Sequence, residues 1–463
     1  MFIGRERELQ DLNRRYQSGK FEFAVIYGRR RVGKTTLINE FIKDKESILY
    51  SATETNAKQN LHDMSQSIYQ LSEDFKGSDA SISSFQKAFE TVFQIAEKRR
   101  IVFVIDEYPY LAGCSKGIAS ILQLLIDKNQ ATSQLFLILC GSSMSFMENQ
   151  VMGYKSPLYG RRTCQYKILP FDFFEARNYY QRLKGEDMAV IYGITGGIPL
   201  YLSMMNERKS VADNIKENFL TANAYLFEEP TNLIKQECRD ASQYNSLISA
   251  IANGATRLSE ISDKTGIESS LATSYLNKLI GLGIVKKETP FGETHSRKTI
   301  YVLEDSMFQF WYRFIPENMS AINRGLTGVV YQRIEPYLSD FMGSVFEEIC
   351  KQYLWRLLAQ GKAAINFTDI GRWWGNDPRV RKQTELDILG IADKDTALFG
   401  ECKWTNKKVD LGVLETLITR SELFPYHTKH FYLFAKTGFT EGCVEKAALM
   451  GNVTLVTFAE MCI

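Results

Sequence analysis

A glycine-rich segment between residues 28 and 36 has the residue types and spacing of a phosphate-binding loop. It follows the pattern Gly-x-x-x-x-Gly-Lys-Thr, with Gly28, Gly33, Lys34 and Thr35 at the fixed positions. Glycines let backbone amides face phosphate oxygens, and a helix that begins there adds partial positive charge. We expect Lys34 to reach the β- and γ-phosphates of ATP and Thr35 to bind Mg²⁺. The predicted ATP-binding residues of this loop are Gly28, Arg29, Arg30, Arg31, Val32, Gly33, Lys34, Thr35 and Thr36.

Two adjacent carboxylates follow an apolar run at residues 101–105, about 70 residues after the loop. A buried strand that ends in this way places the first carboxylate, Asp106, next to the metal of a bound nucleotide. The second, Glu107, is then positioned to polarise the attacking water. The loop and this strand together predict a site that hydrolyses ATP.

A third set of chemically useful residues lies near the C-terminus. Glu401 and Lys403 are two residues apart in a strand-like run at 397–404, so their side chains share one strand face. A hairpin with the run at 385–391 brings Asp387 beside them, and Glu347 on a preceding helix adds a further acid. Carboxylates at Asp387 and Glu401 can hold Mg²⁺ or Mn²⁺, and the lysine can stabilise charge on an attacked phosphate.

The elements that must position the first two sets alternate along residues 1–205. Apolar runs at 21–27, 48–52, 101–105 and 135–140 are separated by helical patterns, and residues 167–170 are a candidate fifth strand. Continuous apolar strands between helices are typical of a parallel sheet covered on both faces. The fold class we expect for this part is therefore α/β.

The remaining chain separates into four further segments. Residues 206–240 are a predicted helical connector, and 305–335 a predicted helical bridge. Residues 241–304 show three helices followed by a two-stranded hairpin, which is the order of a winged helix. Its third helix carries a single lysine, Lys278, and the hairpin turn is more basic, with Lys286, Lys287, Arg297 and Lys298. Residues 336–463 are a predicted C-terminal α/β domain, with strands expected at 364–367, 385–391, 397–404 and 431–434.

The bulk composition limits the remaining classes of protein. A net charge of +2 among 463 residues gives no whole-chain field for nucleic acid, so any such binding must use local patches. The eight cysteines show no Cys-x-x-Cys spacing, which fits reduced thiols better than a zinc ribbon. The longest apolar runs have strand length, and the N-terminus has no apolar signal core. We expect a cytoplasmic protein that does not act on a membrane.

Several segments of residues 1–205 together resemble the archaeal-type ATPases of the STAND branch of the AAA+ superfamily. Residues 2–9, which include Arg5, are similar to the N-terminal box that borders the adenine. Ser142 follows the 135–140 strand as sensor 1 does in that family. Arg161 and Arg162 resemble its arginine segment, and residues 196–199 its Gly-x-Pro motif. The resemblance implies that Ser142 lies near the γ-phosphate and that one of the two arginines assists hydrolysis, in cis or in trans.

The C-terminal set resembles the PD-(D/E)XK nuclease superfamily, which has a helix with Glu, a strand with Asp and then Glu-x-Lys. Here these are Glu347, Asp387, Glu401 and Lys403. The match departs in one place, because Leu386 rather than proline precedes the aspartate. The resemblance implies a restriction-endonuclease-like fold and a metal-dependent cut in DNA.

The sequence therefore predicts an ATP-dependent switch that controls a Mg²⁺-dependent DNA phosphodiesterase. The alternative is a regulatory STAND-type ATPase whose nuclease-like domain only binds DNA or a protein. A transcription regulator that acts through the winged helix is disfavoured, because the third helix carries little charge. The expected partners are ATP and DNA, with self-association or a regulatory protein as further options.

Overall fold

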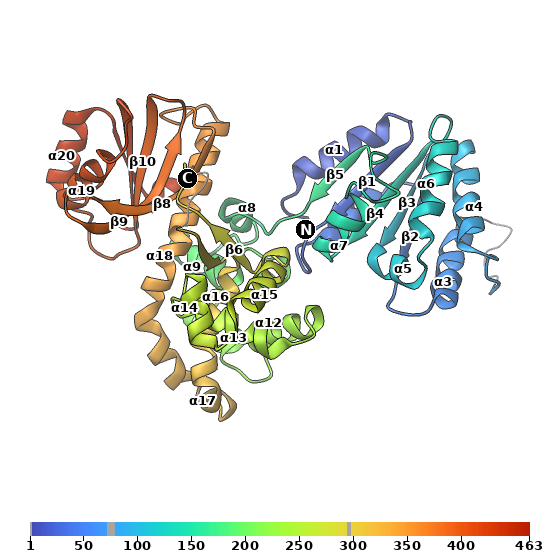
Figure 1. The fold of residues 1–463 in the computed structure, drawn as a ribbon, viewed down its shortest axis with the longest axis horizontal. Coiled ribbons are helices and arrows are strands. Elements are labelled where there is room, and N and C mark those ends of the chain that lie inside the picture. Colours follow the sequence, from blue (N-terminus) through green and yellow to red (C-terminus); the bar gives the residue numbers. More distant parts are fainter. Residues whose placement is uncertain (1, 72–78, 294–297) are drawn as a thin grey trace. The chain divides into compact units, whose positions relative to one another are not determined.

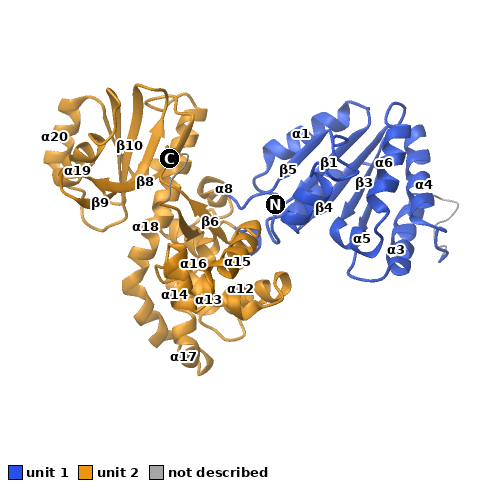
Figure 2. Cartoon of the chain, viewed as in Figure 1, with its two compact units in different colours: residues 1–171, 198–200 blue, residues 172–197, 201–463 orange. Residues whose placement is uncertain are grey.

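The computed structural model describes residues 2–71, 79–293 and 298–463, and the chain divides into two compact units. One comprises residues 1–171 and 198–200, and the other residues 172–197 and 201–463 (Figures 1 and 2). Within the described ranges, no single helix is long and apolar enough to cross a membrane. The bent pair of helices at Tyr108–Cys114 and Ile118–Asn129, with 109° between them, passes that test by length and composition together.

The first unit is built on a five-stranded parallel sheet in the order β2-β3-β4-β1-β5. β1, β3 and β4 are central and almost wholly buried, as expected of apolar strands covered on both faces. β4 separates β1 from β3, so the ends of three neighbouring strands meet at one edge of the sheet. The strands are β1 (Glu22–Tyr27), β2 (Ser47–Ser51), β3 (Ile101–Asp106), β4 (Leu135–Gly141) and β5 (Cys164–Lys167).

Helices cover both faces of this sheet (Figure 1). On one face, Tyr16 of α1 and Phe41 of α2 pack with Phe136 of β4. On the other, Phe89 of α4 packs on Phe103 of β3 within a large apolar core. The helices are α1 (Glu6–Gln17), α2 (Lys34–Ile42), α3 (Ala57–Tyr69), α4 (Phe85–Lys98), α5 (Tyr108–Cys114), α6 (Ile118–Asn129), α7 (Met144–Phe146) and a π-helical turn (Met147–Val151).

The second unit begins with a helical part that contains one small hairpin. Three helices, α13 to α15, precede the antiparallel pair β6 and β7, so the elements expected between residues 241 and 304 are present. The sequence-predicted Arg297 lies outside the described residues. The elements are α8 (Phe173–Arg177), α9 (Gly185–Thr195), α10 (Pro199–Leu202), α11 (Val211–Phe219), α12 (Tyr225–Glu237), α13 (Ala241–Ala252), α14 (Leu258–Thr265), α15 (Ser269–Gly281), β6 (Val285–Glu288), β7 (Ile300–Leu303), α16 (Ser306–Phe314), a 3-10 turn (Pro316–Asn318) and α17 (Met319–Asn323).

A second five-stranded sheet, in the order β12-β11-β10-β9-β8, forms the C-terminal part. It is mixed, because β8, β9 and β10 are antiparallel neighbours whereas β10, β11 and β12 are parallel. α18 packs against β10, and α19 packs against β9, β10 and β11. The elements are α18 (Thr327–Ala359), β8 (Asp369–Asp377), β9 (Lys382–Ile391), β10 (Thr396–Lys403), α19 (Leu411–Ser421), β11 (Thr428–Ala435), α20 (Glu441–Met450), β12 (Val453–Thr457) and α21 (Phe458–Met461).

Three expected elements differ from the structure. The strand expected at 364–367 is absent, and the chain instead enters β8 at Asp369. The fifth strand of the first sheet is Cys164–Lys167 rather than 167–170. α18 runs without a break through Pro336, where we expected a domain to begin. Pro336 removes one helical hydrogen bond, but the freed carbonyl belongs to the exposed Gln332, so water can satisfy it.

Candidate nucleotide and metal sites

The phosphate-binding loop follows β1 and leads into α2, and its shape depends on two glycines. Gly28 has φ 154°, and a Cβ atom there would lie 2.2 Å from the carbonyl oxygen of Ile168. Gly33 has φ 89°, which lies in the left-handed region that favours glycine, and it forms the N-cap of α2. Both positions therefore exclude other residues for backbone reasons. Between these two glycines the chain forms the loop that leads into the N-terminus of α2, and backbone amides at such a position can bind phosphate.

Lys34 is buried inside this loop. Its ammonium group donates to the carbonyl oxygens of Gly28 at 3.0 Å and Arg29 at 2.9 Å. Burial lowers the pKa of Lys34, and the nearby carboxylates of Glu107 and Asp106 oppose that effect. The lysine therefore lies where a phosphate group bound by the loop would need a positive charge.

The ends of β3 and β4 bring three predicted residues to the loop. The Thr35 hydroxyl donates to Oδ2 of the buried Asp106 at 3.0 Å, so the two predicted metal ligands of the ATP site are in direct contact. Glu107, in a left-handed conformation with φ 49°, accepts from the Ser142 hydroxyl at 3.0 Å and from its amide at 3.3 Å. A serine at the end of β4 thus holds the carboxylate that we expect to polarise water.

Arg5 lies beneath the loop and holds its backbone. The side chain is buried, and it donates to the carbonyl oxygens of Val32, at 3.4 Å, and of Leu169. Its guanidinium lies 4.8 Å from the centre of the Phe171 ring. These contacts join the residue before α1 to the backbone of the loop, and a contact of Arg5 with the nucleotide stays a prediction.

The two arginines of the predicted arginine segment have separate partners. Arg161 forms a two-pronged ion pair with Asp127 of α6, at 2.7 and 2.6 Å. Arg162 donates to the carbonyl oxygen of Met152 at 3.5 Å. Among the residues the structure describes, these bonds tie both arginines to the surrounding helix and loop and not to Lys34 or Glu107.

In the C-terminal sheet, β9 and β10 bring three predicted residues together. The register pairs Ile388 with Gly400, so Asp387 and Glu401 follow at the end where the strands separate. The backbone amide of Cys402 donates to Oδ2 of Asp387 at 2.8 Å, and Lys403 donates to Oε1 of Glu401 at 2.7 Å. Asp387 and Glu401 are each only 6% exposed. The hairpin expected from the sequence is therefore present, and its buried carboxylates are adjacent.

The electrostatics show that these acids share one environment with Glu347 of α18. Burial raises the pKa of Asp387 to about 8, and the charges of Glu401 and Glu347 contribute to the rise. Burial also raises the pKa of Glu347, where Arg372 and Lys351 oppose the charges of Glu385 and Glu401. Three carboxylates thus repel one another at the end of the hairpin, an arrangement that a bound cation would stabilise.

Two arginines outside the predicted set of acids and lysine also lie beside this site. Arg420 of α19 donates to Oε2 of Glu401 at 3.3 Å, opposite the oxygen that Lys403 contacts. Arg372 of β8 is paired with Glu385. Neither lies in a recognisable motif, and only the three-dimensional packing of β8 and α19 brings them to the carboxylates.

The donor set of the carboxylate cluster suits a hard divalent cation, because it offers oxygen ligands. Within the described ranges, however, no three His, Cys, Asp or Glu side chains converge closely enough to hold a metal ion as they stand. Glu401 is engaged by Lys403 and Arg420 instead. Cation binding would require these side chains to rearrange.

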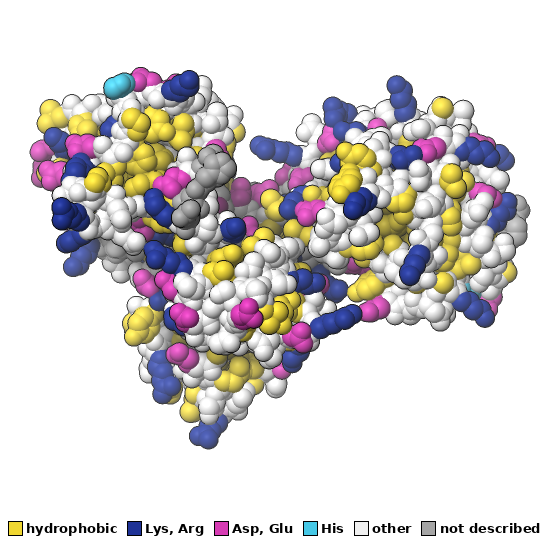
Figure 3. Space-filling view, in the orientation of Figure 1, with side chains coloured by type: hydrophobic (Ala, Val, Ile, Leu, Met, Phe, Trp, Pro, Cys, Tyr) yellow, Lys and Arg dark blue, Asp and Glu magenta, His cyan; other side chains and the backbone are white. Residues whose placement is uncertain are grey.

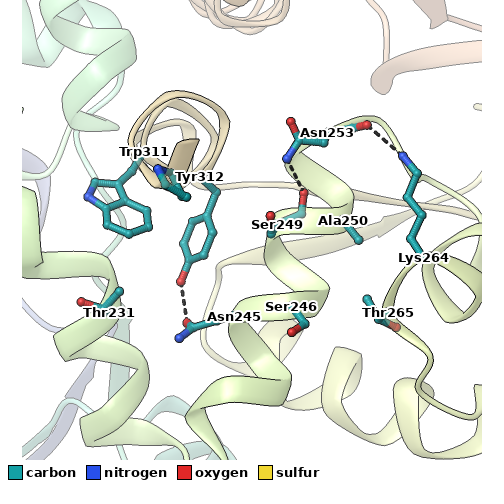
Figure 4. A pocket seen from close by; sticks show the side chains of 11 residues that line it. Thr231, Asn245, Ser246, Ser249, Ala250, Asn253, Lys264, Thr265, Trp311 and Tyr312 are labelled. Atoms are coloured by element: carbon teal, nitrogen blue, oxygen red, sulfur yellow. Dashed lines mark hydrogen bonds between the residues drawn. The ribbon is translucent and has the colours of Figure 1, made fainter. Parts of the chain in front are cut away.

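A separate pocket of about 610 Å³ lies in the helical part of the second unit (Figure 4). Its polar groups bond to one another: the Tyr312 hydroxyl contacts Asn245 at 2.7 Å, and Lys264 donates to the Asn253 carbonyl at 3.1 Å. None of the sequence-predicted site residues lines it. Figure 3 shows basic and acidic side chains interspersed on the visible face of the chain, in keeping with the net charge of +2.

The first unit has a parallel sheet, a glycine-rich loop around a buried lysine, and a threonine hydrogen-bonded to an aspartate at the end of β3. These features define it as a P-loop nucleotide-binding domain. Residues 2–205 match the family described as an ATPase domain predominantly from Archaea. An uncharacterised protein of Methanocaldococcus jannaschii is 32% identical over 410 residues, which cover 88% of this chain and 88% of that protein. The chain belongs to this family of archaeal-type ATPases.

Three further similarities concern parts of the chain. An uncharacterised ATP-binding protein of the same organism is 46% identical over 46 residues, 10% of this chain and 78% of that protein. A Walker-type ATPase of Pyrococcus abyssi has a TM-score of 0.49 at 20% identity, covering 67% of this chain and 96% of that one. Residues 311–413 match a second family, described as archaeal and bacterial proteins of unknown function. That segment includes all four residues of the predicted C-terminal site.

Proposed function

We propose that the archaeal-type ATPase domain is a switch that controls a metal-dependent DNA phosphodiesterase in the C-terminal domain. One observation carries the proposal: Asp387, Glu401 and Lys403 meet at the end of the β9–β10 hairpin, and Glu347 shares their electrostatic environment. Two carboxylates for a metal ion and a lysine beside them can support metal-dependent hydrolysis of a phosphodiester. The proposed domains are the ATPase core (1–205), a winged helix (241–304) and a restriction-endonuclease-like domain (336–463), joined by helical segments at 206–240 and 305–335.

In the ATPase site, the described side chains divide the work of hydrolysis. Thr35 and Asp106 would hold the Mg²⁺ that accompanies ATP, and their mutual hydrogen bond already places both oxygens together. Glu107 would accept a proton from the attacking water, with Ser142 holding its carboxylate. Arg161 and Arg162 remain candidates for assistance, in cis or in trans, once the ion pair of Arg161 with Asp127 opens.

In the C-terminal site, Asp387 and Glu401 would hold Mg²⁺ or Mn²⁺, with Glu347 as a further acid. The ion would supply an activated water and offset the charge of the phosphate. Lys403 lies beside Glu401, where its ammonium group can stabilise the charge that develops on the attacked phosphate. Burial of both carboxylates keeps this charge interaction strong.

The proposed winged helix would act through packing more than through sequence recognition. Its third helix, α15, carries Lys278 as its only basic residue, which gives few contacts to phosphates or bases. DNA is therefore proposed as a partner of the C-terminal domain.

A second candidate function is a regulatory ATPase whose C-terminal domain only binds DNA or protein. One observation favours it: Glu401 is neutralised on both oxygens, by Lys403 and Arg420. A domain that had lost its chemistry could keep such ion pairs for stability alone. The two functions differ in whether a divalent cation can displace these pairs.

Metal titration and cleavage assays on the full chain separate the two functions. Calorimetry would follow Mn²⁺ binding to wild type and to Asp387→Ala, and linear, nicked and branched DNA would be incubated with Mg²⁺ or Mn²⁺, with and without ATP. The nuclease proposal expects Asp387→Ala to lose both C-terminal metal binding and cleavage while keeping its ATP affinity. If wild type binds no cation at this site and cuts none of the substrates, the regulatory function stands alone.

A further inference from the structure

Arg372 occupies an irregular position in β8, directly opposite the carboxylate cluster. The register pairs Gly371 with Leu389 but Trp373 with Leu386, so one residue of β8 faces two of β9. Those two are Asp387 and Ile388. A bulge of this kind re-aims a side chain and is often found beside functional sites. Here the extra residue belongs to β9, and Arg372 is the one residue of β8 that faces it.

The charge of Arg372 is surrounded by acids from two elements. It forms an ion pair with Glu385, two residues before Asp387 on β9. Burial opposes the charged form, yet the negative charges of Glu347, Glu385 and Asp387 raise the pKa of Arg372. Lys403, Lys351 and Arg420 are the other basic groups that face these acids or Glu401. Arg372 is the one among them whose charge acts on both Glu347 and Asp387 from the edge strand.

Phe291 and Lys298, two described residues of the segment between β6 and β7, contact the backbone and side chains around this arginine. The amide of Phe291 donates to the carbonyl oxygen of Arg372 at 2.9 Å. The Phe291 ring covers Gly371, where a Cβ atom would come within 2.6 Å of it. The indole of Trp374 donates to the Lys298 carbonyl at 3.2 Å. Contacts on both sides of Arg372 thus link it to a hairpin that is about 70 residues away in the sequence.

We propose that Arg372 is a positioning residue that stands in for the divalent cation, held at the carboxylates by the β6–β7 hairpin. This inference rests on the proposed metal-dependent function. With the hairpin docked, the guanidinium offsets the charge of Glu347 and Asp387 and competes with a metal ion for them. When the hairpin contact loosens, Arg372 leaves and the cation enters. The hairpin of the proposed winged helix is thereby the element that regulates metal access.

The test is Mn²⁺ calorimetry on the full chain without nucleotide, in a Thr35→Ala background that removes a metal ligand of the ATP site. Arg372→Gln should raise the affinity of the C-terminal site by about tenfold, because a competing positive charge is removed. Arg372→Lys keeps the charge and should restore affinity to near that of the background. Phe291→Ala should tighten binding in the same direction by a smaller factor. Arg379→Gln, which removes an arginine paired with Asp377 and Glu422 at the far end of the same strand pair, is the matched control and should change nothing.

The outcomes separate the proposed role of Arg372 from the proposed metal-dependent function on which it rests. If the background protein binds Mn²⁺ and Arg372→Gln binds it equally or more weakly, Arg372 is structural and the inference fails while the metal site stands. If Arg372→Lys behaves like Arg372→Gln, charge is not the cause and the inference fails in the same way. If Phe291→Ala leaves affinity unchanged, the hairpin has no part in it. If neither the background nor any variant binds Mn²⁺, the metal-dependent function and the inference both fall.

Discussion

The ATP site and the C-terminal carboxylate site solve opposite electrostatic problems. In the first, the negative charge belongs to the ligand, and the protein supplies a helix N-terminus and the buried Lys34. In the second, the negative charge belongs to the protein, in the buried Asp387 and Glu401, and the proposed ligand is a cation. A basic side chain is therefore proposed as a ligand contact in one site and as a competitor of the ligand in the other.

The two sites also differ in what fixes their shape. The phosphate loop is held by backbone geometry, with glycines at the two positions that exclude a side chain or need a left-handed conformation. The carboxylate site is held by ion pairs between side chains of β8, β9, β10 and α19. Side chains exchange partners readily, whereas a backbone loop does not. The phosphate-binding loop is therefore preformed, whereas the shape of the carboxylate site changes when its basic side chains move.

The largest expected effect tests the catalytic half of the ATP site. Glu107→Gln keeps the shape and the contact with Ser142 but loses the base, so ATP hydrolysis should fall by roughly 10²- to 10⁴-fold. Nucleotide affinity should be retained, as measured by calorimetry beside a steady-state phosphate-release assay. Glu97→Gln, on the exposed side of α4, is the control. Hydrolysis at the wild-type rate would remove Glu107 from the mechanism.

A smaller loss is expected at the C-terminal lysine. Lys403→Met should keep Mn²⁺ binding but lower DNA cleavage by about 10²- to 10³-fold, because the ammonium acts on charge that develops in the transition state. The measurement is single-turnover cleavage of a labelled duplex alongside metal calorimetry. Lys446→Met, at an exposed position of α20, controls for the loss of a lysine in the same domain. Equal losses of metal binding and cleavage would mean that Lys403 only holds Glu401 in place.

Lys34→Ala tests whether removing a basic residue has the opposite effect on ligand affinity to the one proposed for Arg372. Loss of a charge-assisted contact to the phosphates costs about 1.5–3 kcal/mol, which corresponds to a tenfold to hundredfold weaker ATP affinity. Removing a basic residue thus weakens ligand binding here, whereas it is proposed to strengthen it in the C-terminal site. Lys43→Ala, at the exposed end of the same helix, should leave the affinity unchanged. Unchanged affinity in Lys34→Ala would place the nucleotide elsewhere.

The smallest effect concerns the scaffold around the ATP site. Burial works against the charge of Asp11, but hydrogen bonds from Tyr166, Arg15 and Arg14 lower its pKa to about 2. A lowered folded-state pKa adds stability above the unfolded value of about 3.9, and this stability is lost as the pH falls toward 2. Asp11→Asn should therefore cost about 1 kcal/mol at pH 7, after allowance for solvent screening.

Urea denaturation of wild type and Asp11→Asn at several pH values measures this difference. The free energies of unfolding of the two proteins should converge between about pH 4 and pH 2, because the wild-type carboxylate becomes protonated over that range. Asp63→Asn, on α3 of the same unit, gives the background effect of removing an acid. A difference that persists unchanged at pH 2 would assign the loss to packing instead of charge.

Sequence and structure agree best where the chemistry lies in one continuous segment. Residues 28–36 match the phosphate-binding pattern by themselves. Residues 101–107 strengthen the prediction of an ATP site, because the apolar strand and the acids that follow it are contiguous. The β9–β10 hairpin was also predictable, since apolar runs flank a short polar turn. The structure places Glu107 beside Ser142 and brings the C-terminal acids near one another. Their catalytic roles stay predictions.

What the sequence did not reveal depends on packing between distant segments. β8 was missed because Gly371, Arg372 and the two tryptophans show no alternation of apolar and polar residues. Pro336 suggested a boundary, yet its exposed setting lets α18 continue. The ion pairs of Arg372 with Glu385 and Arg420 with Glu401 join residues 13 and 19 apart and have no local signature.

The unbroken α18 has a mechanical consequence. Its 33 residues make a rod of about 50 Å, which begins among the helices that follow the β6–β7 hairpin and ends against the C-terminal sheet. Glu347 lies in the half of the rod that packs on that sheet, beyond Pro336. Pro336 lies between the Thr327 end and Glu347, and an interior proline is the place where a helix bends, so a displacement at one end would reach Glu347 through that bend. One continuous helix thus connects the helical part of the second unit with a carboxylate of the proposed metal site.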